Sequence, residues 1–112
     1  MPFIHIETNQ AINDASVPSQ VSSFMATLLN KPEKWMMVSI ADRASMMFGG
    51  QLDPAAVIQL KSIGLNKDQC KTIAPKITSF FEALLNVSGE RMYIDMIDID
   101  PQMFAWNGTT FG

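Results

Sequence analysis

The stretch SFMATLLN at residues 23–30 returns near the other end of the chain as SFFEALLN at residues 79–86. Five of the eight positions are identical, at an offset of 56 residues (79 minus 23), which is half of the 112-residue chain. A short turn follows each copy, then an acidic and a basic residue, and then an apolar run. This self-similarity indicates two copies of one structural unit. Chance resemblance between two amphipathic helices is the alternative.

Each half of the chain is predicted to form a β-α-β unit. Apolar residues within the quoted stretches recur every three or four positions, which is the period of a helix, and the flanking runs are strand-like. Strands joined through a helix favour parallel pairing with a right-handed crossover. We therefore expect an α/β (α+β) fold in which a four-stranded sheet carries two helices on one face. The expected strands are Pro2–Glu7, Lys34–Ala41, Val57–Ile63 and Arg91–Ile99, followed by a short helical turn and a terminal strand within 101–112.

Prolines and an asparagine mark the predicted helix boundaries. Pro18 suits the first turn of the first helix, where a backbone N–H has no helical partner in any case. Asn66 is the predicted N-cap of the second helix, with Gln69 three residues on. Pro75 removes one backbone donor, so it is expected to kink this helix or to delay its regular start.

The expected strand Lys34–Ala41 is apolar on both faces. Trp35 and Met37 alternate with Met36, Val38 and Ile40, and successive side chains of a strand point to opposite faces. Two helices cover only one face, so the other would expose bulky groups worth about 1.5 to 3 kcal/mol of burial each. Soluble proteins rarely tolerate such a patch. The pattern therefore predicts self-association through the uncovered sheet.

Composition narrows the functional classes. With 47% hydrophobic and 17% charged residues, the chain is expected to be one globular domain, residues 1–112. Its net charge of −3, without a basic stripe, argues against a nucleic-acid partner. No apolar run reaches 18 residues, which argues against a membrane partner. The start, MPFIHIETNQ, lacks secretory-signal features, so we expect a cytoplasmic protein unless it is secreted without a signal peptide.

The scarcity of cysteine and histidine limits the kinds of site. Cys70 and His5 are the only residues of their types, so the chain offers no internal disulfide and no recognisable metal site. His5 is expected to be a half-exposed strand residue and not a base. No cofactor is expected.

Pro2 is the first candidate for chemistry. A proline at the start of a strand costs no ladder hydrogen bond, which is a purely structural explanation for it. Removal of Met1 would instead leave Pro2 with a free secondary amine. An amine with a pKa of about 8 is roughly one-tenth neutral at pH 7, and an apolar pocket favours the neutral form. A neutral amine is a competent general base, typically worth about 10²- to 10⁴-fold in rate.

Seven short motifs, in this order, carry a family resemblance over essentially the whole chain. They are MPFI at residues 1–4, Ala15-Ser16-Val17-Pro18, Asn30-Lys31-Pro32, Phe48-Gly49-Gly50, Ser62-Ile63-Gly64, Arg91-Met92-Tyr93-Ile94 and Trp106-Asn107-Gly108-Thr109-Thr110-Phe111. Together they resemble the macrophage migration inhibitory factor family of the tautomerase superfamily, which includes D-dopachrome tautomerase. Each motif alone is weakly specific, whereas seven in register are strongly so.

The resemblance implies a homotrimer with inward-facing sheets and active sites between subunits. It also implies cofactor-free interconversion of the keto and enol forms of phenylpyruvate-like α-keto acids. Pro2 would be the base, Lys31 would hold the substrate carboxylate, and Ile63 would contribute a backbone contact. Trp35, Tyr93, Phe104 and Trp106 correspond to pocket-wall positions, with Tyr93 and Asp95 arriving from the neighbouring subunit. Without the resemblance, Lys31 would be an ordinary solvated cation after a helix, and the aromatic residues would be core or interface.

Three departures from the family pattern bear on the function, and two of them, Asp95 and an altered charge pattern, keep a second function open. The altered charges are around Asn13-Asp14, which replace a basic residue implicated in receptor binding, and at Arg43, where the family has an acidic partner. At Asp95 the family usually has Asn, and a carboxylate near Pro2 would favour the protonated amine and repel an anionic substrate. The CxxC motif linked to thiol chemistry in the family is absent, since the matching stretch is Pro54-Ala55-Ala56-Val57, so we expect no oxidoreductase role. The alternative to a tautomerase is a non-catalytic, cytokine-like binding or signalling protein with a vestigial pocket.

Overall fold

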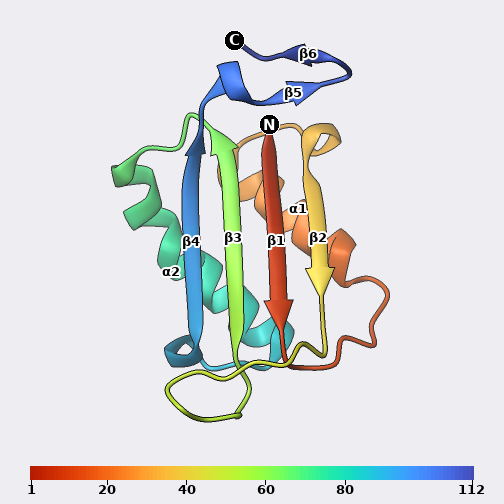
Figure 1. Ribbon diagram of the computed structural model, residues 1–112, viewed down its shortest axis with the longest axis vertical. Coiled ribbons are helices and arrows are strands. Elements are labelled where there is room, and N and C mark those ends of the chain that lie inside the picture. The colour runs from red at the N-terminus through yellow and green to blue at the C-terminus, as the bar shows by residue number, and fades with distance from the viewer.

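The sheet has four strands in the order β2-β1-β3-β4, and both helices lie on one of its faces (Figure 1). The computed structural model describes all of residues 1–112. β1 is parallel to β2 and β3 is parallel to β4, while β1 and β3 pair antiparallel at the centre. Two β-α-β units therefore lie side by side, as the repeat predicts. Their bounds are β1 Pro2–Thr8, α1 Val17–Leu29, β2 Met37–Ala41, β3 Ala56–Ile63, α2 Lys67–Leu85 and β4 Met92–Ile99.

The two copies of the repeat end in the same way. Asn30 and Asn86, their last residues, are left-handed C-caps with φ of 53° and 56°. Asparagine adopts this backbone region more readily than most residues. A 3₁₀ turn follows each cap, η1 at Glu33–Trp35 and η2 at Gly89–Arg91, again 56 residues apart (89 minus 33). Chance resemblance between two helices does not account for a shared helix, cap and turn.

The second strand begins later than predicted. Lys34–Ala41 was expected to be one strand, but Trp35 belongs to η1, where the Met36 N–H donates to the Glu33 carbonyl at 2.9 Å. β2 therefore starts only at Met37. The prediction that Trp35 shares a strand face with Met37 was wrong, and the turn leaves Trp35 free to face the end of the sheet.

The second helix also differs from expectation. α2 runs from Lys67 to Leu85 with Pro75 inside it, so the predicted delay in its start was wrong. Pro75 is exposed, which leaves its ring in solvent. The N-cap prediction is confirmed, because the Asn66 side chain accepts the Gln69 N–H at 2.8 Å.

The C-terminal segment is a hairpin and not a single strand. After the turn η3 at Pro101–Met103, β5 at Ala105–Trp106 pairs antiparallel with β6 at Thr109–Thr110. Asn107 and Gly108 connect them with positive φ, as an Asn-Gly hairpin turn requires. The hairpin lies beyond the end of the sheet where β1 begins, so both termini are at this end (Figure 1).

Burial separates the two faces of the sheet. Along β1 and β3 every second residue is buried, and those side chains form one core with the helices. Phe81 of α2 is fully buried in this core. The core residues from the two central strands are Ile4, Ile6, Ala56, Ile58 and Leu60. Neither helix is both long enough and apolar enough to span a bilayer.

The uncovered face is mixed, where the sequence predicted an apolar one. Met37, Tyr93 and Ile97 are exposed on it at 61%, 68% and 39%. Polar and charged residues alternate with them and with the other apolar side chains of this face. These polar members are His5, Glu7, Ser39, Gln59, Lys61 and Asp95. The expectation failed because it was argued from one strand, whereas β1, β3 and β4 also bring polar residues to this face and β2 itself brings Ser39.

Candidate active site

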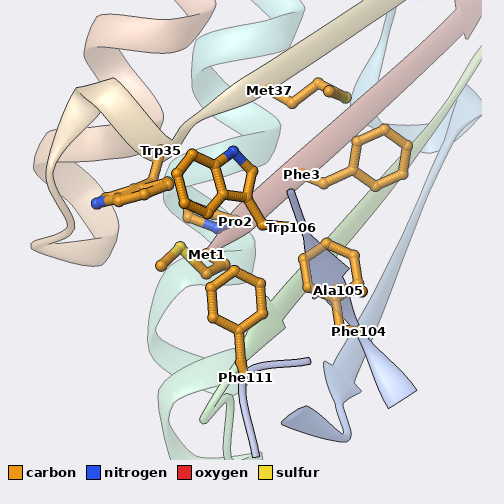
Figure 2. A pocket seen from close by; sticks show the side chains of 9 residues that line it. All are labelled: Met1, Pro2, Phe3, Trp35, Met37, Phe104, Ala105, Trp106 and Phe111. Atoms are coloured by element: carbon orange, nitrogen blue, oxygen red, sulfur yellow. The ribbon is translucent and has the colours of Figure 1, made fainter. Parts of the chain in front are cut away.

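An apolar pocket of about 360 Å³ surrounds the start of β1 (Figure 2). Pro2 at its base is buried, because it is the first residue of a central strand and points to the helix-covered face. Phe3, next in the strand, lies in register with Met37 of β2, and both line the pocket. The complete lining is Met1, Pro2, Phe3, Trp35, Met37, Phe104, Ala105, Trp106 and Phe111.

Two aromatic pairs build the pocket wall. Trp35 from η1 meets Trp106 from β5 edge to face, with ring centroids 5.0 Å apart and planes at 88°. Phe104 and Phe111 stack at 5.8 Å. Such pairs prefer these geometries because of the quadrupole of the ring. Residues from opposite ends of the chain therefore enclose Pro2, as Figure 2 shows.

The terminal amine in this pocket is protonated less readily than an amine in water. Burial, chiefly, lowers the pKa of the Met1 amine below its ordinary value of 8.0, and the nearby Lys31 ammonium lowers it further. Burial acts by removing water from the charged form, and Lys31 acts by like-charge repulsion. An amine at this place is thus shifted toward its neutral, basic form.

Lys31 and Ile63 meet beside the pocket. The Lys31 Nζ donates to the Ile63 carbonyl at 3.4 Å, a long bond that leaves the ammonium with donors to spare. Both residues line a second cavity of about 240 Å³ between the end of α1 and the start of α2. Lys31 is half-buried. A cation in this place can hold an anionic group of a molecule that enters next to Pro2.

The whole chain matches a family model described as "Macrophage migration inhibitory factor (MIF)", over residues 1–112. The chain belongs to the macrophage migration inhibitory factor family. A MIF homolog from Brugia malayi is 35% identical over 115 residues, covering 100% of both chains. The crystal structure of a MIF homologue from Prochlorococcus marinus superposes with a TM-score of 0.90 at 34% identity, covering 98% of this chain and 99% of that one. The MIF structure from Trichinella spiralis gives 0.93 at 28% identity, with coverage of 97% and 99%.

Two of the predicted site residues of this MIF-family chain lie outside its own pocket. Tyr93 and Asp95 are on β4, which β3 separates from β1, and both point to the uncovered face. Tyr93 contacts Phe48 of the loop before β3, with ring centroids 5.0 Å apart. Neither residue lines the pocket around Pro2 of the same chain.

The remaining predicted residues fall into two groups. Pro2, Trp35, Phe104 and Trp106 come together in one pocket, while Lys31 and Ile63 pair next to it. Besides Met1, which is expected to be removed, the sequence analysis missed four lining residues, which are Phe3, Met37, Ala105 and Phe111. Phe3 and Met37 could have been predicted, since parallel pairing of the first two strands places these apolar residues next to each other. For Phe111 the sequence gives no indication beyond its place in a family motif.

Proposed function

We propose that this MIF-family chain is a cofactor-free keto–enol tautomerase that acts on phenylpyruvate-like α-keto acids. The observation that carries the proposal is the apolar pocket around Pro2, in which burial and Lys31 both lower the pKa of a terminal amine. Met1 is removed in the active protein, and the Pro2 nitrogen is then a secondary amine with a basic lone pair. The substrate side chain lies among the aromatic rings, and Lys31 holds the carboxylate.

The reaction is a proton transfer in two steps. The neutral Pro2 amine takes a proton from the carbon next to the ketone, and that C–H electron pair forms the new C=C bond. The carbonyl oxygen gains the electron pair of the broken C=O π bond and then a proton from the Pro2 ammonium, which returns the base. No electron is gained or lost overall, so no redox partner is needed.

The proposed active assembly is a homotrimer. Tyr93 and Asp95 lie on the uncovered face and away from the pocket of their own chain, which supports a role in the site of a neighbouring subunit. Tyr93 there contributes pocket wall, and Asp95 supplies a carboxylate that favours the protonated amine. Each site of this trimer therefore carries one more negative charge than it would with Asn at this position.

Ultraviolet detection of phenylpyruvate keto–enol conversion tests the proposal directly. Pro2→Gly keeps a small second residue, so Met1 is still trimmed, but it removes the secondary amine. We expect a loss of about 10²-fold or more in kcat/KM. Equal rates for the two proteins would exclude Pro2 as the base. Intact-mass measurement, which should show a chain lighter by one methionine, establishes that the amine is free.

Retention of Met1 would favour the non-catalytic alternative. Met1 lines the same pocket, and while it remains attached the Pro2 nitrogen is an amide without a basic lone pair. A chain that retained Met1 would place its own side chain where the substrate ring is expected. The mass measurement separates the two functions, because a full-length mass together with no turnover supports a binding or signalling role.

A further inference from the structure

Two polar side chains are buried in this protein, and only one is satisfied. Thr8 and Ser62 are 0% and 1% exposed, at opposite ends of the β1–β3 ladder. The Thr8 hydroxyl donates to the Ala55 carbonyl at 2.8 Å. The Ser62 hydroxyl has no hydrogen-bond partner. A buried hydroxyl without a partner is unfavourable and is uncommon in folded proteins, so Ser62 calls for an explanation.

The nearest residues do not supply a partner. The Lys31 ammonium donates to the carbonyl of Ile63, and the Asp98 carboxylate accepts the Gly64 N–H at 2.9 Å. Ser62 points to the helix-covered face with Leu60, so a subunit packed against the uncovered face does not reach its hydroxyl. Self-association therefore leaves Ser62 as it is.

The residue directly across the ladder from Ser62 is Pro2. Both side chains are buried on the same face. Directly paired residues of an antiparallel ladder have Cβ atoms about 4.5–5.5 Å apart, so the Ser62 hydroxyl lies against the pyrrolidine ring. With Met1 attached, the ring nitrogen has no hydrogen to donate. Removal of Met1 gives it one N–H when neutral and two when protonated.

We propose that Ser62 is a positioning residue whose hydroxyl oxygen accepts a hydrogen bond from the Pro2 amine once Met1 has been removed. The unsatisfied hydroxyl then belongs only to the unprocessed chain, and processing creates its partner. In the neutral amine, the N–H directed at Ser62 leaves the lone pair to face the pocket. This inference rests on the proposed function only in requiring a free Pro2 amine.

The proposed hydrogen bond shifts the pKa of the Pro2 amine in a definite direction. A hydrogen bond from a charged donor is stronger than one from a neutral donor, so Ser62 stabilises the protonated amine more than the neutral one. Loss of the hydroxyl should therefore lower the pKa of the Pro2 amine. The charged groups around this end of the sheet stay the same in Ser62 variants. They are Lys31 in the turn after α1, Glu33 and Lys34 in η1, Lys61 on β3 and Asp98 on β4. In the proposed trimer, Asp95 from β4 of the neighbouring subunit joins them.

The titration can be followed without turnover by ¹⁵N NMR of protein labelled with ¹⁵N-proline. The chain has six prolines, and only a terminal one carries a titrating nitrogen, because the other five are tertiary amides. We expect Ser62→Ala to move the titration midpoint to lower pH by about 0.5 to 1 pH unit. Ser62→Cys, which keeps the shape but accepts weakly, should shift it in the same direction. Thr8→Val removes the other buried hydroxyl and should leave the midpoint unchanged.

Three results would overturn the proposal. They are an unchanged midpoint in both Ser62 variants, an equal shift in Thr8→Val, and a native protein that keeps Met1. A second measurement uses a chain extended before Met1, in which the Pro2 nitrogen stays an amide. Ser62→Ala should reduce the thermal midpoint of the processed protein and leave that of the extended protein unchanged or raised. Equal effects in the two backgrounds would contradict the proposal. A normal Ser62 shift in a protein without tautomerase activity would reject only the proposed function.

Discussion

In the proposed mechanism Lys31 has two separable effects, one on the substrate and one on the base. It lies close enough to the chain terminus to lower the pKa of an amine there, second to burial. Because like charges disfavour protonation, replacing Lys31 with a neutral residue raises that pKa. The neutral amine is the active form, so the rising limb of the pH–rate profile moves to higher pH.

Lys31→Met tests this sign. We expect the rising limb of the profile of kcat/KM against pH to shift to higher pH, because the like-charge repulsion from Lys31 is lost. KM for an α-keto acid should also rise, since the carboxylate loses its cation. Lys76→Met, on an exposed position of α2, is the matched control and should change neither quantity. A limb that stays in place in Lys31→Met would show that Lys31 does not act on the base.

The candidate site was predictable from sequence to the extent that it depends on one chain and on family motifs. Pro2, Trp35, Phe104 and Trp106 converge as the resemblance implied. Trp35 lines the pocket because it lies in a 3₁₀ turn and not in the strand, which the periodicity of the sequence did not reveal. The unpaired Ser62 hydroxyl was invisible in the sequence, since satisfaction of a buried group depends on its neighbours in space.

At the scale of elements, the final asparagine of each repeat follows from backbone geometry. Asn86 ends α2 with φ of 56°, a region that costs most residues about 1–2 kcal/mol. We expect Asn86→Ala to lower the free energy of unfolding by about 1 kcal/mol, measured by urea denaturation at fixed protein concentration. Asn86→Gly should stay within about 0.5 kcal/mol of wild type, because glycine adopts this region freely. Equal losses for both variants would assign the effect to the side chain instead.

Arg91 fixes the long loop before β3. Its guanidinium donates to the carbonyls of Phe48, Gln51, Asp53 and Pro54 at 2.9–3.0 Å. It also lies 5.3 Å from the centre of the Phe48 ring. Since Phe48 packs on Tyr93, this one side chain couples the loop to a residue on the uncovered face.

Loss of the planar donor fork should therefore destabilise the protein. We expect Arg91→Gln to reduce the free energy of unfolding by about 1–3 kcal/mol, and Arg91→Lys to be intermediate, because a lysine cannot reach four carbonyls at once. Arg43→Gln provides the control. Arg43 is exposed and pairs with the adjacent Asp42, so its removal should cost less than about 1 kcal/mol. If the Arg91→Gln protein were as stable as the Arg43→Gln protein, the loop before β3 would not depend on Arg91.

Most helices and strands could be predicted from the repeat, but the residues at which they begin and end could not. Periodicity identified both helices and four strands, because it reflects which face is buried. The starts of β2 and β4 were missed by three residues and one residue, since Trp35 and Arg91 continue a 3₁₀ turn set by local hydrogen bonds. The hairpin after Pro101 carried a recognisable Asn107-Gly108 turn, but its strands of two residues are too short to show alternation.

At the scale of the whole molecule, the uncovered face of the sheet is the surface that the proposed trimer would bury. It presents Met37, Tyr93 and Ile97, all exposed, among charged and polar neighbours. That mixture suits an interface with both apolar and hydrogen-bonded contacts better than it suits a purely hydrophobic interface. In the proposed trimer this face would also complete the site, because Tyr93 and Asp95 do not line the pocket of their own chain.

The assembly can be tested by mass in solution. Multi-angle light scattering should give three times the chain mass of 12.4 kDa for the wild type. Ile97→Asp places a charge at the predicted subunit contact and should lower the mass and abolish tautomerase activity together, because burying an unpaired carboxylate is strongly unfavourable. Ser79→Asp adds the same charge to an exposed position on α2 and should remain at full mass. A wild-type protein with the mass of one chain would refute the trimer, and full activity in that state would confine the site to residues of one subunit.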